Sequence, residues 1–269
     1  MTRFRYHRPR RGPWLQLFNA RGWEWNRVEV TIADLPADLD GLRMVQISDL
    51  HLRSRWPGRL DEFISRVNAD PPALILFTGD FVDDKYDHRP ALPHVERLVS
   101  RLLSDHGSFA IVGNHDMDLL APHLVRFGVS VMVHRRVEVP IGAAKLELIG
   151  LPGPERGDLD NRFLEGLPPR RAGVPRIVLS HYPDLLRNMI SIEREPDIYL
   201  AGHTHGGQIC LPNECPILRH DTFPRRLCKG AHEVAGTCLV VSRGFGFTTL
   251  PLRVFCPAEV IEIVLRATD

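Results

Sequence analysis

The sequence of 269 residues contains no apolar run that approaches the roughly 20 residues needed for a membrane-spanning helix. It also has no amino-terminal apolar stretch followed by small residues, so a cleaved secretory signal is not indicated. Its charges nearly balance, with 34 Lys and Arg residues against 33 Asp and Glu, which argues against a nucleic-acid partner. These absences favour a cytoplasmic protein.

Cysteine is scarce, and its spacing excludes two common kinds of framework. The five cysteines are odd in number, fall in the last quarter of the chain and form no CxxC pair. Neither a zinc ribbon nor a set of disulfides is therefore supported. We expect free thiols, as in a reducing compartment.

The first 25 residues differ in composition from the rest of the chain. Several arginines precede any acidic residue, and aromatic and aliphatic side chains follow them: Arg3, Arg5, Arg8, Arg10, Arg11, Trp14, Leu15, Leu17, Phe18, Trp23 and Trp25. Two interpretations stay open. The segment is either a basic tail whose apolar part packs on the domain, or a contact with an anionic membrane surface, which would make the protein peripheral on the inner face.

Alternation of apolar residues at Val28, Val30 and Ile32 predicts a lead-in strand before the main domain. A chain of this length lies near the upper limit of what one hydrophobic core supports. We therefore expect a basic and aromatic segment with its strand over residues 1–41, and one catalytic domain over residues 42–269.

From residue 42 onward, short apolar runs alternate with helical patterns. The runs, which predict buried strands, cover residues 44–47, 74–77, 109–112, 176–179 and 197–200, and two later ones cover 238–242 and 260–265. Apolar spacing of i, i+3, i+4 and i+7 predicts helices at residues 60–67, 95–103 and 185–190. Residues 137–149 surround Gly142 and predict a hairpin. The class is α/β, with enough strands for two packed sheets.

A polar cluster follows the carboxyl end of each of five predicted strands, where ligands bind in open α/β sheets. In extended chain, residues i and i+2 point to the same side, so we expect the members of the Asp–Leu–His and His–Thr–His sequences to converge. The metal-ligand candidates are Asp49, His51, Asp80, Asn114, His181, His203 and His205.

Seven donors exceed what one ion takes, since a transition metal binds about four to six ligands. They fit two divalent ions that share a bridging carboxylate. Mixed imidazole and carboxylate ligands suit Mn, Fe, Zn, Co or Ni and argue against calcium, which prefers oxygen ligands throughout. Two such ions can activate a bridging water as hydroxide and clamp phosphate oxygens, so the sequence predicts a phosphoesterase.

His115 is a candidate for general-acid catalysis and not for metal binding. It is next to Asn114, and neighbouring side chains do not easily reach the same ion. A histidine there could protonate the leaving oxygen, and Asp116 or Asp83 could hold its tautomer through a hydrogen bond.

Taken together, the ordered motifs DxH, GDxxD, GNHD, a single His and GHTH resemble those of the calcineurin-like metallophosphoesterase superfamily over residues 42–265. The resemblance implies a four-layer αββα sandwich of two mixed sheets flanked by helices. It implies one metal at Asp49, His51, Asp80 and His205, and a second at Asp80, Asn114, His181 and His203. It also implies that Asp80 bridges the two and that His115 is the catalytic histidine.

The longer strings GHTHGGQI at residues 202–209 and SRGFG at residues 242–246 are similar to a bacterial branch of membrane-associated phosphodiesterases. That branch includes enzymes of lipid A biosynthesis that cleave the pyrophosphate of UDP-2,3-diacylglucosamine. The resemblance implies hydrolysis of a phosphodiester or pyrophosphate, in a phosphorylated small molecule or a lipid. The alternatives are a phosphodiesterase acting on cyclic nucleotides or nucleic acid, and a catalytically silent scaffold.

Overall fold

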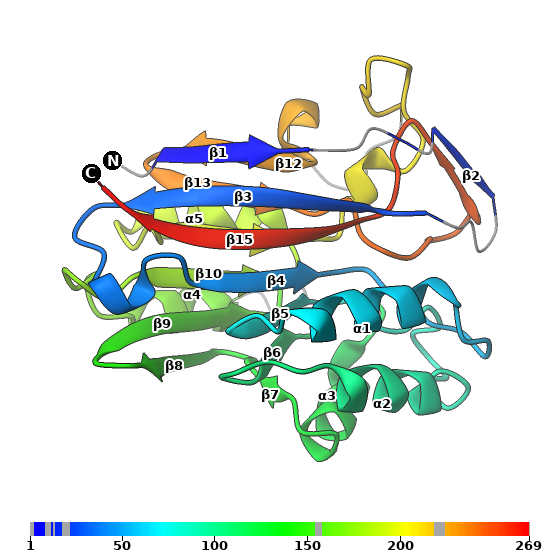
Figure 1. Ribbon diagram of the computed structural model, residues 1–269, viewed down its shortest axis with the longest axis horizontal. Coiled ribbons are helices and arrows are strands. Elements are labelled where there is room, and N and C mark those ends of the chain that lie inside the picture. Colours follow the sequence, from blue (N-terminus) through cyan, green and yellow to red (C-terminus); the bar gives the residue numbers. More distant parts are fainter. Residues whose placement is uncertain are drawn as a thin grey trace.

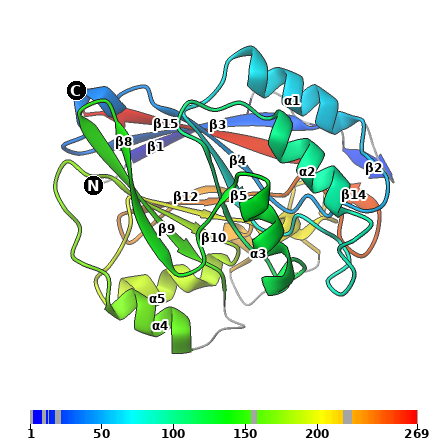
Figure 2. The same cartoon turned by 90° about the horizontal axis from the view of Figure 1, so that it is seen from below.

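The computed structural model describes residues 3–8, 12, 14–17, 22–153, 158–217 and 224–268. Two large β-sheets face each other, and helices cover their outer faces (Figures 1 and 2). The α/β class and the sandwich of two mixed sheets flanked by helices are therefore confirmed. Among the described residues, no helix combines the length and the apolar character needed to cross a bilayer.

The first sheet has seven strands and is mixed. Its spatial order is β1 (Arg3–His7), β3 (Glu24–Ile32), β15 (Glu259–Ala267), β4 (Arg43–Ile47), β5 (Leu74–Thr78), β6 (Ser108–Ile111) and β7 (Ser130–Val131). Strands β4 to β7 run parallel, whereas β15 is antiparallel to β4 and parallel to β3. The carboxyl ends of β4, β5 and β6 therefore meet at one edge of this sheet.

The second sheet has six strands in the order β12 (Gly230–Val234), β13 (Thr237–Val241), β11 (Ile198–Ala201), β10 (Arg176–Ser180), β9 (Ala144–Leu151) and β8 (Arg135–Ile141). Strands β9, β10, β11 and β13 are parallel, and the β8–β9 hairpin turns at Gly142, as the sequence predicted. A separate two-stranded ribbon pairs β2 (Leu15–Leu17) with β14 (Leu252–Val254).

Helices α1 (Arg59–Ala69) and α2 (Leu92–Arg101) lie on the outer face of the seven-stranded sheet, and α4 (Asp158–Glu165) and α5 (Leu186–Ser191) cover the other sheet (Figure 2). Helix α3 (Met117–Arg126) follows β6. Short 3-10 turns span Ala37–Leu39, Pro183–Leu185, His205–Gly207 and Arg225–Leu227.

Three apolar clusters hold these layers together, one between the sheets and one under each helical layer. In α1 the predicted i, i+3, i+4 and i+7 positions, Leu60, Phe63, Ile64 and Val67, are all buried. Burial of each such side chain stabilises the fold by about 1.5–3 kcal/mol before entropic losses are counted. The hydrophobic pattern of the helix thus fixes it to the sheet whose strand ends carry the polar clusters.

The amino-terminal segment contributes strands to the first sheet. The predicted lead-in strand is confirmed as β3, and it is an inner strand between β1 and β15. Arg3 and Arg5 lie in β1, so this stretch is paired backbone and not a loose tail. Arg10, Arg11 and Phe18 lie outside the described residues. A division of the chain into residues 1–41 and 42–269 stays a prediction.

A cluster of buried ions ties this segment to the far end of the chain. The side chain of Glu24 on β3 is fully buried and accepts hydrogen bonds from Arg8 and Arg243, each at 2.6 Å. Arg243 also donates to Glu259 on β15 at 2.6 Å. Burial alone would raise the pKa of Glu24, but its ion pairs with Arg8 and Arg243 outweigh burial and lower the pKa.

We expect this cluster to make the protein sensitive to acid. Because the pKa of Glu24 in the fold lies below its ordinary value of 4.5, its charge stabilises the fold fully above pH 4.5. That stabilisation is lost as the pH falls through the folded pKa. Thermal melts of Glu24→Gln should show a lower Tm than the unmodified protein at pH 7, and the gap should narrow below pH 4.5.

Glu96→Gln is the matched control, because Glu96 is an exposed glutamate on α2. Its melting curves should follow those of the unmodified protein at every pH. A gap for Glu24→Gln that stays constant through the acid range would contradict the assignment of this pH dependence to Glu24.

Candidate metal centre

The predicted donors come together at one edge of the sandwich, where loops from both sheets meet. Asp49 and His51 follow β4, Asp80 follows β5 and Asn114 follows β6, all from the seven-stranded sheet. Three more donors, His181, His203 and His205, follow β10 and β11 of the other sheet. Backbone hydrogen bonds join these loops, including Asp49 N to Gly79 O at 2.9 Å and Gly202 N to His181 O at 3.1 Å.

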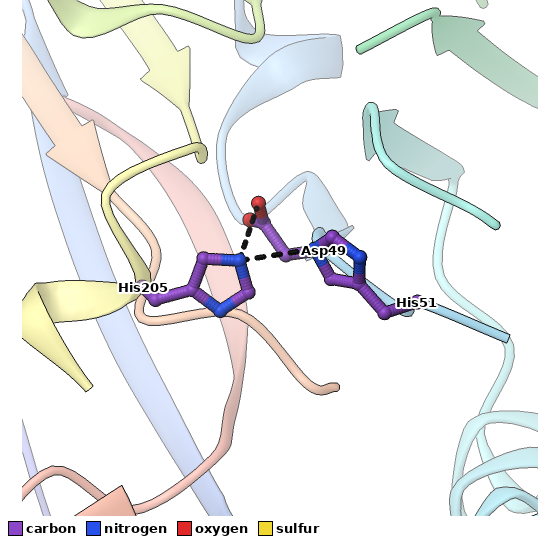
Figure 3. A group of neighbouring side chains, drawn as sticks. All are labelled: Asp49, His51 and His205. Atoms are coloured by element: carbon purple, nitrogen blue, oxygen red, sulfur yellow. Dashed lines mark hydrogen bonds and ion pairs between the residues drawn. The ribbon is translucent and has the colours of Figure 1, made fainter. Parts of the chain in front are cut away.

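One group of donors consists of Asp49, His51 and His205, all buried (Figure 3). The Nε2 atoms of His51 and His205 face each other at 3.0 Å, and His205 Nε2 lies 3.5 Å from Asp49 Oδ1. Two facing ring nitrogens cannot both carry a proton, so at least one lone pair points into this space.

A second group forms around His181, with an amide oxygen between two imidazoles. Asn114 Oδ1 lies 3.0 Å from His181 Nε2 and 3.1 Å from His203 Nδ1, and the two nitrogens are 3.3 Å apart. The other ring nitrogen of His181, Nδ1, lies 2.8 Å from the carbonyl of Thr78. If that nitrogen carries the proton and donates it, Nε2 is left with a free lone pair.

The carboxylate of Asp80 lies between the two groups. Its Oδ2 is 3.5 Å from His51 Nε2 and 3.3 Å from His181 Nε2, and its Oδ1 accepts a hydrogen bond from the backbone N–H of His115 at 2.8 Å. Asp80 thus lies at ion-pair distance from imidazoles on loops of both sheets. The same carboxylate can therefore serve both groups.

These distances fit metal coordination. Two ligand atoms that each lie about 2.1 Å from one ion, at tetrahedral or octahedral angles, are about 3.0–3.4 Å apart. The nitrogen and oxygen pairs in both groups lie 3.0–3.5 Å apart. The donor set of imidazole, carboxylate and amide is chemically suited to divalent transition metals.

The backbone reason for this convergence differs from the one expected. Asp49 and His51 were predicted to share a side as extended chain, but both have positive φ, 51° and 44°. Positive φ also occurs at three further donors, Asp80, His203 and His205. Left-handed conformations are uncommon for residues with side chains and are found where function requires them. Tight left-handed turns, and not strand periodicity, thus aim these donors inward.

His115 lies at the rim of the centre, and the carbonyl of Asp83 holds its ring. His115 Nδ1 is 2.5 Å from that carbonyl oxygen, and the ring is 4.7 Å from the ring of His51. The expected partner of His115 was the carboxylate of Asp83 or Asp116. Instead, the Asp83 carboxylate pairs with Arg53 at 2.8 Å and lies 3.4 Å from His51 Nδ1.

Asp116 has a different position from the one predicted. Its buried carboxylate accepts hydrogen bonds from the backbone N–H groups of Phe81, Val82 and Gly113, at 2.7, 3.2 and 2.9 Å. These contacts connect the loop after β5 with the loop after β6. Asp116 therefore supports the backbone around Asp80 and does not orient His115.

Electrostatic coupling among the buried groups is strong. For His181, burial opposes the charged ring, but the neighbouring Asp80 carboxylate outweighs burial and raises the pKa to about 10. For Asp80, burial likewise opposes ionisation, and His181 and His51 outweigh it and hold the pKa well below its usual range. The Asp80 carboxylate therefore favours a positive charge beside it, which either a metal ion or a protonated imidazole can supply.

Two features of the site had no signal in the sequence analysis. Arg253 on β14 is fully buried; its guanidinium donates to the carbonyls of Gly246 and His205 and lies 3.3 Å from Nδ1 of His205. The sequence predicted neither a strand nor a site residue at positions 252–254. His88 is also buried, and its Nε2 lies 3.2 Å from the carbonyl of His115.

Comparison with known proteins places these residues in a broader group. A family model described as calcineurin-like phosphoesterase matches residues 42–207. The uncharacterized metallophosphoesterase YkuE of Bacillus subtilis is 31% identical over 243 residues, which cover 87% of this chain and 82% of YkuE. Phosphodiesterase YaeI of Escherichia coli is 28% identical over 235 residues, covering 83% of this chain and 82% of YaeI.

Two other similar proteins match over a smaller share of their own length or at lower sequence identity. A transmembrane protein with metallophosphoesterase domain from Bos taurus is 28% identical over 263 residues; these cover 89% of this chain but 56% of that protein. Among solved structures, the phosphopantetheinyl hydrolase PptH from Mycobacterium tuberculosis has a TM-score of 0.48 and 13% identity, over 80% of this chain and 96% of PptH.

The close approach of Gly244 to Asp49 gives a test of how tightly the centre is built. Gly244 has a φ of 75°, and a Cβ at this position would lie 2.7 Å from Asp49 Cβ. We expect Gly244→Ala to destabilise the protein by about 2–4 kcal/mol, because left-handed strain adds to a steric clash. Bound metal, measured by mass spectrometry, should fall as Asp49 shifts.

Gly236→Ala is the control, because it measures the loss of stability caused by left-handed backbone strain without a steric clash. Gly236 has a φ of 81°, and nothing lies within 4 Å of its hypothetical Cβ. This variant should lose only about 1 kcal/mol in urea unfolding and keep its metal. Equal losses in the two variants, with full metal occupancy in both, would mean that the contact with Asp49 is unimportant.

Proposed function

Because this chain belongs to the calcineurin-like phosphoesterase family, we propose that it hydrolyses a phosphodiester or pyrophosphate bond at a centre of two divalent transition-metal ions. The enzyme is a phosphoester hydrolase. Cleavage of a diester is supported by similarity to a protein named phosphodiesterase, YaeI. The metals proposed are drawn from Mn, Fe, Zn, Co and Ni, which share a preference for mixed imidazole and carboxylate ligands.

The single observation that carries this proposal is the position of Asp80 between two groups of donors, one buried and the other partly buried. We assign one ion to Asp49, His51, Asp80 and His205, and the other to Asp80, Asn114, His181 and His203. When bound, two adjacent divalent ions polarise phosphate oxygens and lower the pKa of water. The chain itself would supply the ligands that hold this charge in place.

His115 is the residue that we propose to transfer a proton to the leaving oxygen. Its ring lies next to that of His51, and its Nδ1 contacts the carbonyl of Asp83. If Nδ1 donates to that carbonyl, Nε2 is the ring nitrogen available for proton transfer. A silent scaffold would not need to keep this residue together with seven donors, so we favour an active enzyme.

The role of His115 can be separated from that of the metal ligands. We expect His115→Ala to keep its bound metal while turnover of bis-p-nitrophenyl phosphate falls by about two to four powers of ten. Asp80→Asn should instead lose metal, because the shared carboxylate is gone. Metal content and rates would be measured after reconstitution with each of the five metals.

Two results would count against this scheme. Loss of metal from His115→Ala would make His115 a ligand, and no turnover by the unmodified protein with any of the five metals would favour the scaffold. A parallel screen of cyclic nucleotides, oligonucleotides and UDP-linked glycolipids would separate the proposed lipid substrates from the nucleotide alternatives.

A lipid-bearing substrate at an anionic membrane surface is the second part of the proposal, and the β2–β14 ribbon supports it. In this ribbon the apolar side chains face solvent and the polar side chains are buried, the reverse of the usual arrangement. Leu15 and Leu17 on β2 are 59% and 53% exposed, whereas Gln16 between them and its pairing partner Arg253 are fully buried. The outward face thus carries leucines, and the inward face carries an amide and a guanidinium.

Further apolar groups extend this face. Leu252 and Val254 alternate with buried Arg253 on β14 and are partly exposed, and Trp14 and Leu250 are 42% and 52% exposed. The ribbon lies at one end of the molecule (Figure 1). A contiguous apolar patch of this kind marks an interaction surface, and exposed Arg55 shares a cavity with neighbouring Pro251. Apolar and cationic groups together suit anionic lipid.

We expect the double variant Leu15→Ser, Leu17→Ser to bind vesicles of phosphatidylglycerol and phosphatidylcholine at least tenfold more weakly than the unmodified protein. Loss of two buried leucines from the lipid removes more than the 1.4 kcal/mol that corresponds to tenfold. Co-sedimentation would measure the partition. Leu103→Ser, which replaces an equally exposed leucine after α2, should bind normally. Identical partition of all three proteins would remove the membrane part of the proposal.

A further inference from the structure

A cavity of about 330 Å³ opens beside the metal centre and is lined by both apolar and cationic residues. His51, a proposed metal ligand, contributes to one part of its wall, and Arg59, Phe247 and Pro251 contribute to others. Its volume lies within the range of small-molecule binding sites, roughly 300–1,000 Å³. A group attached to a phosphate at the metal centre could therefore enter this cavity.

Arg59 is the unusual residue in this wall. Its side chain lies at the start of α1 and is 9% exposed, yet Nε and Nη1 have no hydrogen-bond partner among the described residues. No carboxylate in the described part of the chain lies within ion-pair distance of it. Buried guanidinium groups are normally paired, because an unpaired buried charge is strongly destabilising.

The surroundings of Arg59 compensate its charge only in part. The guanidinium carbon lies 4.7 Å from the ring centroid of Phe245 and 5.2 Å from that of Phe247, so two aromatic faces attract it. Burial and the nearby charge of Arg253 lower the pKa of Arg59 to about 9, which still leaves it a cation at neutral pH. Arg253 donates its hydrogen bonds to backbone carbonyls, which are neutral. Its own positive charge therefore adds to that of Arg59.

From this geometry we infer that Arg59 is the receptor for a second anionic group of the substrate. The site would then select phosphoesters that carry a further phosphate or carboxylate on the side of the cavity, bound by the unpaired N–H groups of the guanidinium. The inference rests on the proposed function, because it assigns the scissile phosphate to the metals beside His51.

The planar guanidinium suits this task because its N–H groups bind oxyanions in pairs. Its position at the amino end of α1 adds a favourable helix dipole for an anion. A bound oxyanion would satisfy donors that have no partner among the described residues. An unpaired Arg59 lowers the stability of the free protein, and substrate binding would offset that loss. Binding therefore favours substrates that carry a second anionic group.

Calorimetric titration with sulfate tests the receptor directly, with metal-loaded protein and without turnover. We expect Arg59→Met to bind sulfate at least tenfold more weakly than the unmodified protein, with Arg59→Lys in between, because lysine keeps the charge but not the paired donors. Titration with acetate shows whether the receptor binds carboxylates as well as tetrahedral anions such as sulfate. Equal sulfate affinity in all three proteins would overturn the inference.

Arg126→Met is the control for loss of one positive charge. Arg126 is exposed on α3 and lies over the ring of Phe127 at 5.5 Å, so it resembles Arg59 in chemistry but does not line the cavity beside the metal centre. Its sulfate affinity should match that of the unmodified protein. A drop as large as that of Arg59→Met would mean that net charge alone is responsible.

Stability separates a receptor from a structural residue. Replacement of an unpaired buried charge by a hydrophobic side chain is often neutral or stabilising. We therefore expect Arg59→Met to melt at the same temperature as the unmodified protein or higher. A lower Tm together with unchanged sulfate binding would show that Arg59 serves the fold.

Kinetics test the substrate class. The p-nitrophenyl ester of thymidine 3′-phosphate, with and without a 5′-phosphate, provides a pair of substrates that differ by one anionic group. Arg59→Met should reduce kcat/KM at least tenfold more for the 5′-phosphorylated ester, mainly through KM. Equal reductions would reject the selectivity. If the unmodified enzyme cleaves neither these esters nor bis-p-nitrophenyl phosphate with any of the five metals, the proposed function fails, whereas the sulfate titration still decides whether Arg59 binds anions.

Discussion

The carboxylate of Asp80 lies in the interior with its two oxygens facing different partners. Oδ2 lies near imidazoles from both sheets, and Oδ1 binds the backbone of His115. A buried carboxylate requires nearby positive charge or hydrogen-bond donors, so the loops around it must hold their positions closely. Asp116 helps by binding three backbone N–H groups from the two loops that meet there. Much of the edge of the sandwich is thus built around one shared carboxylate.

The sequence predicted the parts of the fold that have strong hydrophobic periodicity. Strands β4, β5, β6, β10 and β11 were recognisable because they are apolar runs followed by polar residues. Strands β1, β2, β12 and β14 were missed because they are short or half-exposed, and β2 and β14 pair with each other from distant parts of the chain. Helix α3 was missed because Pro122 interrupts its pattern.

The donors of the site could be predicted because their residue types and order are specific, but their geometry could not. The left-handed backbone at Asp49, His51 and Asp80 depends on contacts between loops, which no local pattern encodes. For the same reason the carbonyl of Asp83, and not a carboxylate, faces His115. Arg59 had no signal at all, because its significance lies in its three-dimensional surroundings, where no described residue accepts a hydrogen bond from Nε or Nη1.

Three other buried arginines of this protein have hydrogen-bond acceptors within the described chain. Arg176 pairs with Glu147, and Arg243 pairs with Glu24 and Glu259. Arg253 binds a set of backbone carbonyls. Against this background, the unsatisfied donors of Arg59 beside a cavity point to a partner that comes from outside the chain.

The position of β15 has a consequence for biosynthesis. Residues 259–267 form the strand that joins β3 to β4, so the centre of the seven-stranded sheet is incomplete until these residues, far along the chain from β3 and β4, have been made. At about 5–20 residues per second, the ribosome takes roughly 10–50 s to reach β15 after β3. During that interval β3 and β4 lack their shared neighbour, and their unpaired edges can associate with other nascent chains. Expression yield should therefore depend on chaperones that shield these strands until β15 has been made.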